Sequence, residues 1–246
     1  MSKIIKRVQI FGERNSGTNY VKELIILNFP EITFTTDYGW KHGFADIDKI
    51  NNSDHSDDLF LCIFKDPYAW LVSMKRKPHH APHLKDLRFT KFLRHEWSSY
   101  DLKRDHKRDI NLDPLRSEEE IMTDRNPETG ERIKNVIQLR NLKTKSFLQL
   151  MEHEINSEVI KYEDLLLDCK NTMDAIASKW NISKTSIFQD TLGYHGKNPR
   201  KTFPRKEYYL KKKYLESFSS GDLQFTNSQL EEKLENDLGY SIINTL

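Results

Sequence analysis

The fold of this chain is decided by residues 8–27, which read VQIFGERNSGTNYVKELIIL. Residues 8–11 are mostly β-branched or aromatic and predict a short strand that stops at the first glycine. The apolar residues of the segment 20–27 recur with the spacing of one helix face. Residues 12–19, between the two, are rich in Gly, Asn, Ser and Thr, a composition typical of a loop. The stretch therefore predicts a strand, a polar loop and a helix in direct succession.

The same alternation continues along the chain. Further strands are predicted at 32–36, 59–64 and 158–162, and helices from Pro67, over about 135–152 and after the last strand. Because strands that alternate with helices form βαβ units, the sequence predicts an α/β fold of three layers with a mostly parallel central sheet. Ligands of such sheets bind beyond the carboxyl ends of the strands. We therefore expect a site in the loops that follow the first three strands.

The length of 246 residues predicts one domain, residues 1–246. Residues from about 75 to 134 are charged and rich in proline, and we interpret them as an insertion that forms a lid or acceptor-binding region, helical over 89–100. Near the carboxyl terminus, residues 226–229 (TNSQ) have the pattern of a capping box and predict that a helix begins there.

Composition excludes several classes of protein. The chain has 39 Lys and Arg against 37 Asp and Glu, a net charge of +2, which argues against a general nucleic-acid-binding protein. The two cysteines, Cys62 and Cys169, form neither a disulfide framework nor a metal-binding spacing. The start of the chain has no apolar leader, and no run approaches the roughly 20 apolar residues that span a bilayer. We therefore expect a cytoplasmic protein without a transmembrane segment.

The loop after the first strand has the composition of an anion-binding loop. It opens a helix, so its backbone N–H groups can converge on an anion at the helix N-terminus. Gly12 and Gly17 allow close approach of the backbone, and Ser16, Thr18 and Asn19 offer side-chain donors. The lysine that a Walker A motif requires before its Ser or Thr is missing. An ordinary strand-to-helix turn capped by a hydroxyl is the alternative interpretation.

The loop after the third predicted strand places a cation beside a hydroxyl. Lys65 follows the strand, and Ser73 comes eight residues later. If a helix begins at Pro67, Ser73 lies about two turns along it, and both side chains can contact one phosphate. The alternative is that Lys65 is a solvated strand end.

Taken together, these segments resemble the sulfotransferases that use 3′-phosphoadenosine 5′-phosphosulfate (PAPS). Residues 16–19 are similar to the loop of that family that binds the 5′-phosphosulfate. The spacing of Lys65, Pro67 and Ser73 is similar to its 3′-phosphate segment, and residues 159–165 (VIKYEDL) to a strand-to-helix junction. The three similarities occur in the order of the family.

The resemblance implies PAPS as co-substrate and a P-loop-like fold. It assigns binding of the 5′-phosphosulfate to Asn15, Ser16, Gly17, Thr18 and Asn19. It assigns the 3′-phosphate to Lys65 and Ser73, and a basic closing loop to Lys197 and Arg200. The sequence also departs from the family. Asn15 stands where a basic residue is usual, with Arg14 one position earlier, and Lys65 replaces an arginine, which loses the bidentate fork.

The loop after the second predicted strand is where a catalytic base is expected. Sulfuryl transfer needs a base for the acceptor proton and cations that spread the developing charge. His42 suits the first task and Lys41 the second, while Arg14 is expected to turn towards the transferred group. Asp37 is the reserve candidate for the base.

No metal site is expected, because His79, His80 and His83 have no acidic or cysteine partner nearby in the sequence. The leading hypothesis is a sulfotransferase that acts on a hydroxyl or amine of a carbohydrate or small-molecule acceptor. Two alternatives stay open. One is a P-loop kinase or NTPase, and the other is a nucleotide-binding module without catalysis on the same fold.

Overall fold

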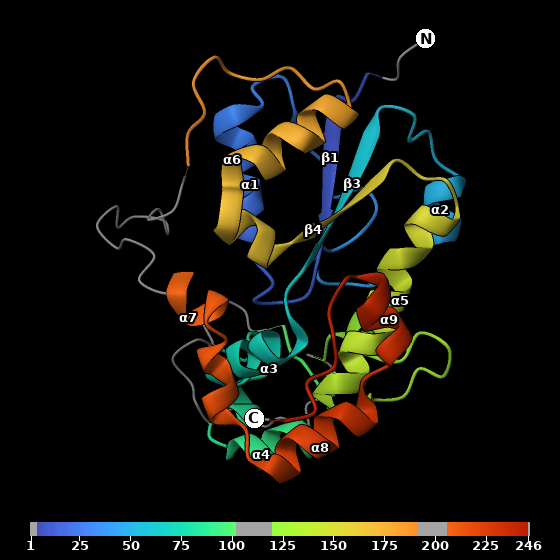
Figure 1. Ribbon diagram of the computed structural model, residues 1–246. Coiled ribbons are helices and arrows are strands. Elements are labelled where there is room, and N and C mark those ends of the chain that lie inside the picture. Colours follow the sequence, from blue (N-terminus) through green and yellow to red (C-terminus); the bar gives the residue numbers. More distant parts are fainter. Residues whose placement is uncertain (1–3, 102–119, 191–205, 246) are drawn as a thin grey trace. The chain divides into compact units, whose positions relative to one another are not determined.

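The computed structural model describes residues 4–101, 120–190 and 206–245 of the chain (Figure 1). The chain divides into two compact units. The first comprises Met1–Asp66 and Ser146–Tyr214, and the second comprises Pro67–Lys145 and Leu215–Leu246. The predicted insertion at 75–134 falls wholly within the second unit, which extends beyond it at both ends.

The first unit contains a four-stranded sheet in which every strand pair is parallel, in the order β2-β1-β3-β4. Its strands are β1 (Arg7–Phe11), β2 (Thr33–Phe34), β3 (Asp58–Phe64) and β4 (Ser157–Lys161). Its helices are α1 (Thr18–Asn28), α2 (Ile47–Asn51), α6 (Tyr162–Lys179), α7 (Lys206–Leu210) and the last residues of α5 (Val136–Glu152). The predicted α/β fold with a parallel sheet is confirmed.

The two faces of the sheet follow from the alternation of side chains along each strand. On one face, alternate residues of β1, β3 and β4 form a core with α1 and α6, which Figure 1 shows on the same side of the sheet. This core includes Val8, Ile10, Leu59, Leu61, Ile63, Ile160, Val21, Leu24, Leu165 and Met173. Burial of each large apolar side chain contributes about 1.5–3 kcal/mol.

The opposite face of the sheet is aromatic. Phe11 of β1 stacks on Phe60 of β3 with ring centroids 6.2 Å apart. Phe147 of α5 covers this face, 5.6 Å from Phe11 and 6.1 Å from Phe64. Because β3 is buried on both faces, its seven residues read as an uninterrupted apolar run after the first, as the sequence predicted.

β2 is shorter than the predicted strand at 32–36. Only Thr33 and Phe34 pair with β1, and a turn follows in which Gly39 N–H donates to Thr36 O at 3.0 Å. Gly39 has a φ of 110°, in the left-handed region that favours glycine. The turn ends the regular ladder.

The strand order creates a switch point between β1 and β3. From β1 the chain turns to β2 on one side, and after β2 it crosses to β3 on the other. In open parallel sheets, ligands bind outside the carboxyl ends of the strands at such a point. The loop after β1 and the first residues after β3 therefore occupy the expected position of a site.

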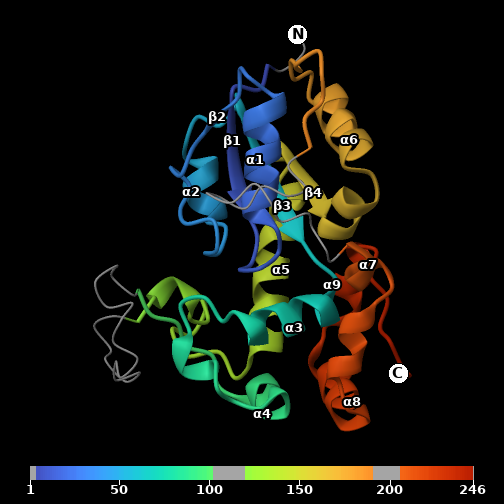
Figure 2. The same cartoon turned by 90° about the vertical axis from the view of Figure 1, so that its left-hand side faces the viewer.

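The second unit is helical. Its helices are α3 (Pro67–Arg76), α4 (Phe89–Arg94), α8 (Ser220–Gln229), α9 (Glu232–Asp237) and the first part of α5. Short 3₁₀ turns lie at Pro82–Leu84 and Met122–Asp124. A third 3₁₀ turn, Lys213–Ser217, spans the point in the sequence where the first unit ends and the second resumes. α4 and α8 lie side by side in both views (Figure 2), and Arg94 of α4 pairs with Asp222 of α8 at 2.8 Å.

Two sequence expectations in this unit are wrong. The helix predicted over 89–100 ends at Arg94, because Trp97 instead forms an antiparallel bridge with Ile133. The capping box at 226–229 begins no helix, because these residues close α8. That helix begins earlier, where the Ser219 hydroxyl accepts a hydrogen bond from Asp222 N–H at 3.1 Å. Over the described ranges, no helix combines the length and apolar character needed to cross a membrane.

Candidate functional site

The loop after β1, residues 12–17, is shaped by close contacts that only glycine permits. Gly17 has a φ of 108°, and a Cβ there would lie 2.7 Å from Cδ2 of Tyr162. A Cβ on Gly12 would lie 2.7 Å from Ile63 O of β3. Asn15 adopts a φ of 64°, which asparagine tolerates better than most residues. The loop is therefore folded tightly against β3 and the start of α6.

The loop leads into the N-terminus of α1. Gly17 is the N-cap and has no side chain that could cap the first turn, and none of the residues of that turn is acidic. The first N–H groups of a helix have no partner within the helix and carry partial positive charge. Ser16 Oγ is also buried with no hydrogen-bond partner among the described residues. Figure 2 shows β1 leading into this loop and α1 leaving it. The arrangement is suited to an anion.

The charged residues of this loop are buried and neutralise each other. NH1 of Arg14 lies 3.6 Å from Oε2 of Glu13, and the Arg14 side chain is fully buried. Its guanidinium lies 4.8 Å from the ring centroid of Trp40. These contacts make Arg14 a support for Trp40 in this structure. The expected approach of Arg14 to a transferred group stays a prediction.

His42 is bonded directly to the β1 loop. Its Nδ1 lies 2.6 Å from the carbonyl oxygen of Gly12, and its side chain is largely buried. Because a carbonyl oxygen only accepts, Nδ1 carries the hydrogen in the neutral ring, and Nε2 is the nitrogen with the lone pair. The Trp40 ring packs edge-on to the imidazole at 5.2 Å. The contact with Gly12 O therefore fixes the orientation of the imidazole ring and assigns the hydrogen of the neutral ring to Nδ1.

Lys41 links the same loop to α1. Its Nζ donates to Asn19 Oδ1 at 2.6 Å, and its carbonyl oxygen accepts from Gly12 N–H at 3.0 Å. Burial lowers the pKa of Lys41 from its ordinary value, and repulsion from Lys22 lowers it further. The Lys41 ammonium group thus lies beside Asn19, in the first turn of α1.

The depressed pKa of Lys41 yields a direct test. We expect Lys41 to titrate below the ordinary lysine range, and Lys22→Ala to raise its pKa because one repelling charge is removed. NMR titration of chain labelled with ¹³C on lysine measures both values. A Lys41 pKa that does not respond to Lys22→Ala contradicts the predicted repulsion.

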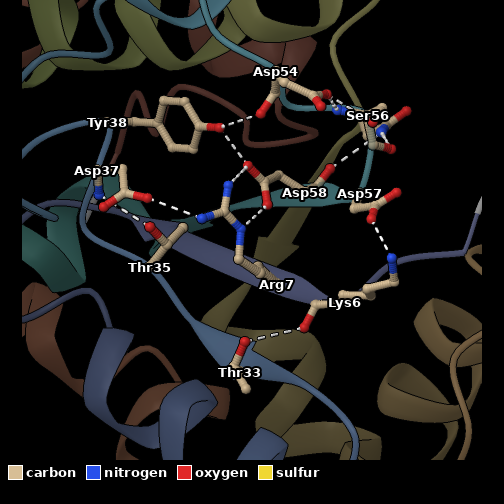
Figure 3. A network of polar contacts seen from close by, with 11 residues as sticks. Lys6, Arg7, Thr33, Thr35, Asp37, Tyr38, Asp54, Ser56, Asp57 and Asp58 are labelled. Carbon is tan, nitrogen blue, oxygen red and sulfur yellow. Dashed lines mark hydrogen bonds and ion pairs between the residues drawn. The ribbon is translucent and has the colours of Figure 1, made fainter.

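Asp37, the reserve candidate for the base, lies elsewhere. Its carboxylate pairs with Arg7 at 2.9 Å, and Arg7 is the first residue of β1 (Figure 3). Arg7 also binds Asp58, the first residue of β3, which accepts a short hydrogen bond from Tyr38. These residues mark the amino end of the sheet, and four residue steps of about 3.3 Å separate Arg7 from the end of β1. Asp37 therefore belongs to a network that anchors the loop.

Lys65 is not a solvated strand end, because only 3% of it is exposed. Its Nζ lies 4.1 Å from the ring centroid of Tyr162 and 4.5 Å from that of Tyr209. The following residue, Asp66, donates its N–H to Glu163 Oε1 at 3.1 Å. Tyr162 also contacts Gly17, so one ring lies between the loop after β1 and the cation after β3.

The remaining predicted residues are placed as follows. Thr18 is the first residue of α1 and is buried. Ser73 is buried on α3 in the second unit, where its hydroxyl donates to Ala69 O at 2.9 Å. The expectation that it shares a phosphate with Lys65 stays a prediction. Lys197 and Arg200 lie outside the described residues.

Three aromatic residues of the site were not predicted from the sequence, namely Trp40, Tyr162 and Tyr209. Tyr162 lies within the quoted segment 159–165, and Trp40 directly precedes Lys41, so their neighbourhood carried a signal. Tyr209 is remote from Lys65 in the sequence and lies in a short helix, so no local pattern could identify it.

The described residues contain no group of three or more His, Cys, Asp or Glu side chains placed to hold a metal ion. Of the three histidines considered above, His83 contacts Ser98 at 3.2 Å. Comparisons with known protein families, with curated proteins and with solved structures find no match to this chain.

Proposed function

We propose that this chain is a sulfotransferase that moves a sulfuryl group from PAPS to a hydroxyl or amine of an acceptor. The observation that carries the proposal is the hydrogen bond between His42 Nδ1 and the carbonyl of Gly12. It joins the proposed base to the loop that leads into the N-terminus of α1. A base and an anion-binding loop at one switch point suit the transfer of a charged group.

In the proposed step, the acceptor oxygen or nitrogen attacks the sulfur atom while His42 Nε2 takes the acceptor proton. The bond from sulfur to the bridging phosphate oxygen breaks, and that oxygen keeps the electron pair. The products are the sulfated acceptor, adenosine 3′,5′-bisphosphate and the imidazolium of His42. The Gly12 carbonyl then stabilises the imidazolium, because Nδ1–H of His42 donates a charge-assisted hydrogen bond to it.

The other residues hold and compensate charge. Backbone N–H groups at the start of α1, with Ser16, are assigned to the 5′-phosphosulfate, and Lys41 to the charge that develops on the leaving oxygen. Lys65 is assigned to the 3′-phosphate. Trp40, whose ring packs against His42, is assigned to a flat apolar surface of the acceptor, such as one face of a sugar ring.

The first experiment is a thermal-shift titration with adenosine 3′,5′-bisphosphate, compared with AMP and with ATP plus magnesium. A ligand at 100 times its Kd stabilises the folded chain by about 2.7 kcal/mol. We expect the bisphosphate alone to raise Tm by several degrees, and Lys65→Ala to abolish the increase. Lys184→Ala, at an exposed lysine, is the matched control that keeps it.

Each alternative function has its own outcome. Stabilisation by ATP with magnesium and not by the bisphosphate supports a kinase or NTPase. Stabilisation by the bisphosphate with no transfer to any of a panel of hydroxyl and amine acceptors supports a binding module without catalysis. Absence of stabilisation by any of the three nucleotides overturns the assignment of the loop after β1 to the donor.

A further inference from the structure

The environment of Lys65 is unusual for a lysine. The side chain is almost fully buried, and its ammonium group is within cation–π distance of two tyrosine rings, Tyr162 on α6 and Tyr209 on α7. Each ring face attracts a cation, and the attraction is stronger when the cation is desolvated. We call Tyr162 and Tyr209 the tyrosine clamp. The clamp brings together two helices that are distant in the sequence.

The clamp is itself held by further aromatic contacts. The rings of Tyr162 and Tyr209 meet edge to face at 5.4 Å, and Tyr208 packs edge-on to Tyr209 at 5.3 Å. Tyr214 lies 6.4 Å from Tyr209 and is hydrogen-bonded to Asp66, the residue after Lys65. Only 5% of Tyr209 is exposed. The ring of Tyr209 therefore has little freedom to move without disturbing its neighbours.

A lysine at this position lacks what an arginine would supply. A guanidinium is a planar fork that orients two hydrogen bonds to a phosphate, whereas an ammonium is a point charge on a flexible stem that loses rotamer freedom when it is fixed. A lysine can match the fork only if its surroundings fix the position of the charge. Two ring faces beside Nζ fix its position by cation–π attraction.

We propose that Tyr209 is a positioning residue, which holds the Lys65 ammonium at the carboxyl edge of the sheet so that it binds the 3′-phosphate of the donor. The proposal rests on the proposed function, because Lys65 is there assigned to that phosphate. Tyr209 acts through Lys65, and its own hydroxyl is not required. The competing interpretation is that Tyr209 is a gate, whose ring must leave before a phosphate can reach Lys65.

A double-mutant cycle separates these interpretations. Affinity for adenosine 3′,5′-bisphosphate is measured by calorimetry for the wild type and for Tyr209→Ala, Tyr209→Phe, Lys65→Ala and the double variant Lys65→Ala/Tyr209→Ala. We expect Tyr209→Ala to weaken binding about tenfold, because the Lys65 ammonium must then be fixed when the ligand binds, and Tyr209→Phe, which keeps the ring face, to change it less than about twofold. In the Lys65→Ala background, Tyr209→Ala should have no further effect.

Two outcomes of the cycle overturn the proposal. An equal loss from Tyr209→Ala in both backgrounds means that Tyr209 acts independently of Lys65. Tighter binding by Tyr209→Ala means that the ring is a gate.

A second measurement needs no nucleotide, so it tests the role of Tyr209 even if the proposed function is wrong. Reductive methylation of Lys65, followed by mass spectrometry, reports how well its amine is held and covered. We expect Tyr209→Ala to accelerate this reaction about tenfold and Tyr209→Phe to leave it unchanged, with the exposed Lys184 unaffected in every variant. If the wild type fails to bind the bisphosphate, the proposed function fails. If Lys65 reacts equally in all variants, the clamp itself is overturned.

Discussion

Replacement of His42 by asparagine is expected to lower the rate constant of sulfuryl transfer by about 100- to 10,000-fold, the range for loss of a general base. Asparagine is chosen because its side-chain amide can replace Nδ1–H as the donor to Gly12 O, which His42 contacts at 2.6 Å. The variant therefore keeps the anchor of the loop and loses only Nε2. The rate is measured under saturating donor and acceptor, so that binding does not limit it.

The control for this variant is Asp37→Asn. Asp37 pairs with Arg7 at the amino end of β1, and its loss is expected to leave the transfer rate unchanged. His42→Asn should also keep the thermal stabilisation by adenosine 3′,5′-bisphosphate, because His42 is assigned no contact with the donor. A transfer rate within about threefold of the wild type would show that another group takes the proton.

The second large effect is expected from Gly17→Ala, which should both destabilise the first unit and weaken binding of the bisphosphate. The φ of 108° costs a residue with a Cβ about 1–3 kcal/mol. In addition, the new Cβ would lie 2.7 Å from Cδ2 of Tyr162, closer than any tolerated contact. Relief of that clash must move either the ring of Tyr162 or the start of α1, and both belong to the site. Chemical denaturation and calorimetry measure the two effects.

Gly39→Ala is the matched control for the backbone cost alone. Gly39 has a φ of 110°, almost the same as that of Gly17, but a Cβ there meets nothing within 4 Å. We expect Gly39→Ala to destabilise the chain by the backbone cost and to leave the affinity for the bisphosphate unchanged. The difference between the two variants measures the contact with Tyr162. Equal destabilisation with equal affinity would show that this contact does not shape the site.

Much of the fold could be predicted because its signals are local. The apolar run of β3 and the glycine after β1 identified a parallel sheet and the edge where a site belongs. Prediction failed where two local signals competed. The residues 226–229 have a capping pattern, but Ser219 begins α8 earlier and draws them into its last turn. The prediction of a helix over 89–100 also failed at its end, because a bridge between Trp97 and Ile133 takes the place of the last predicted helical residues.

The candidate site was predicted in its loops but not in its contacts. Residues Lys41 and His42 follow β2, and the structure brings them to Gly12 and Asn19 by hydrogen bonds. The sequence carried no sign that Arg14 is buried beneath Trp40 or that Asp37 pairs at the other end of β1. These contacts depend on the path of the loop between 35 and 43, which runs beside β1 from one end to the other.

The sequence by itself determined the alternation of strands and helices, the glycines of the loop after β1, and the cation at the end of β3. The spacing of apolar residues and the positions of glycines determine local structure through residues that are close in the sequence, and so they can be recognised from the sequence alone. Only the tertiary structure decided which nitrogen of His42 is bonded to Gly12 and what holds Lys65. The orientation of His42 follows from the carbonyl of Gly12 in another loop, and the position of Lys65 from the ring of Tyr209 on α7. Folding brings these groups together, although no spacing in the sequence relates them.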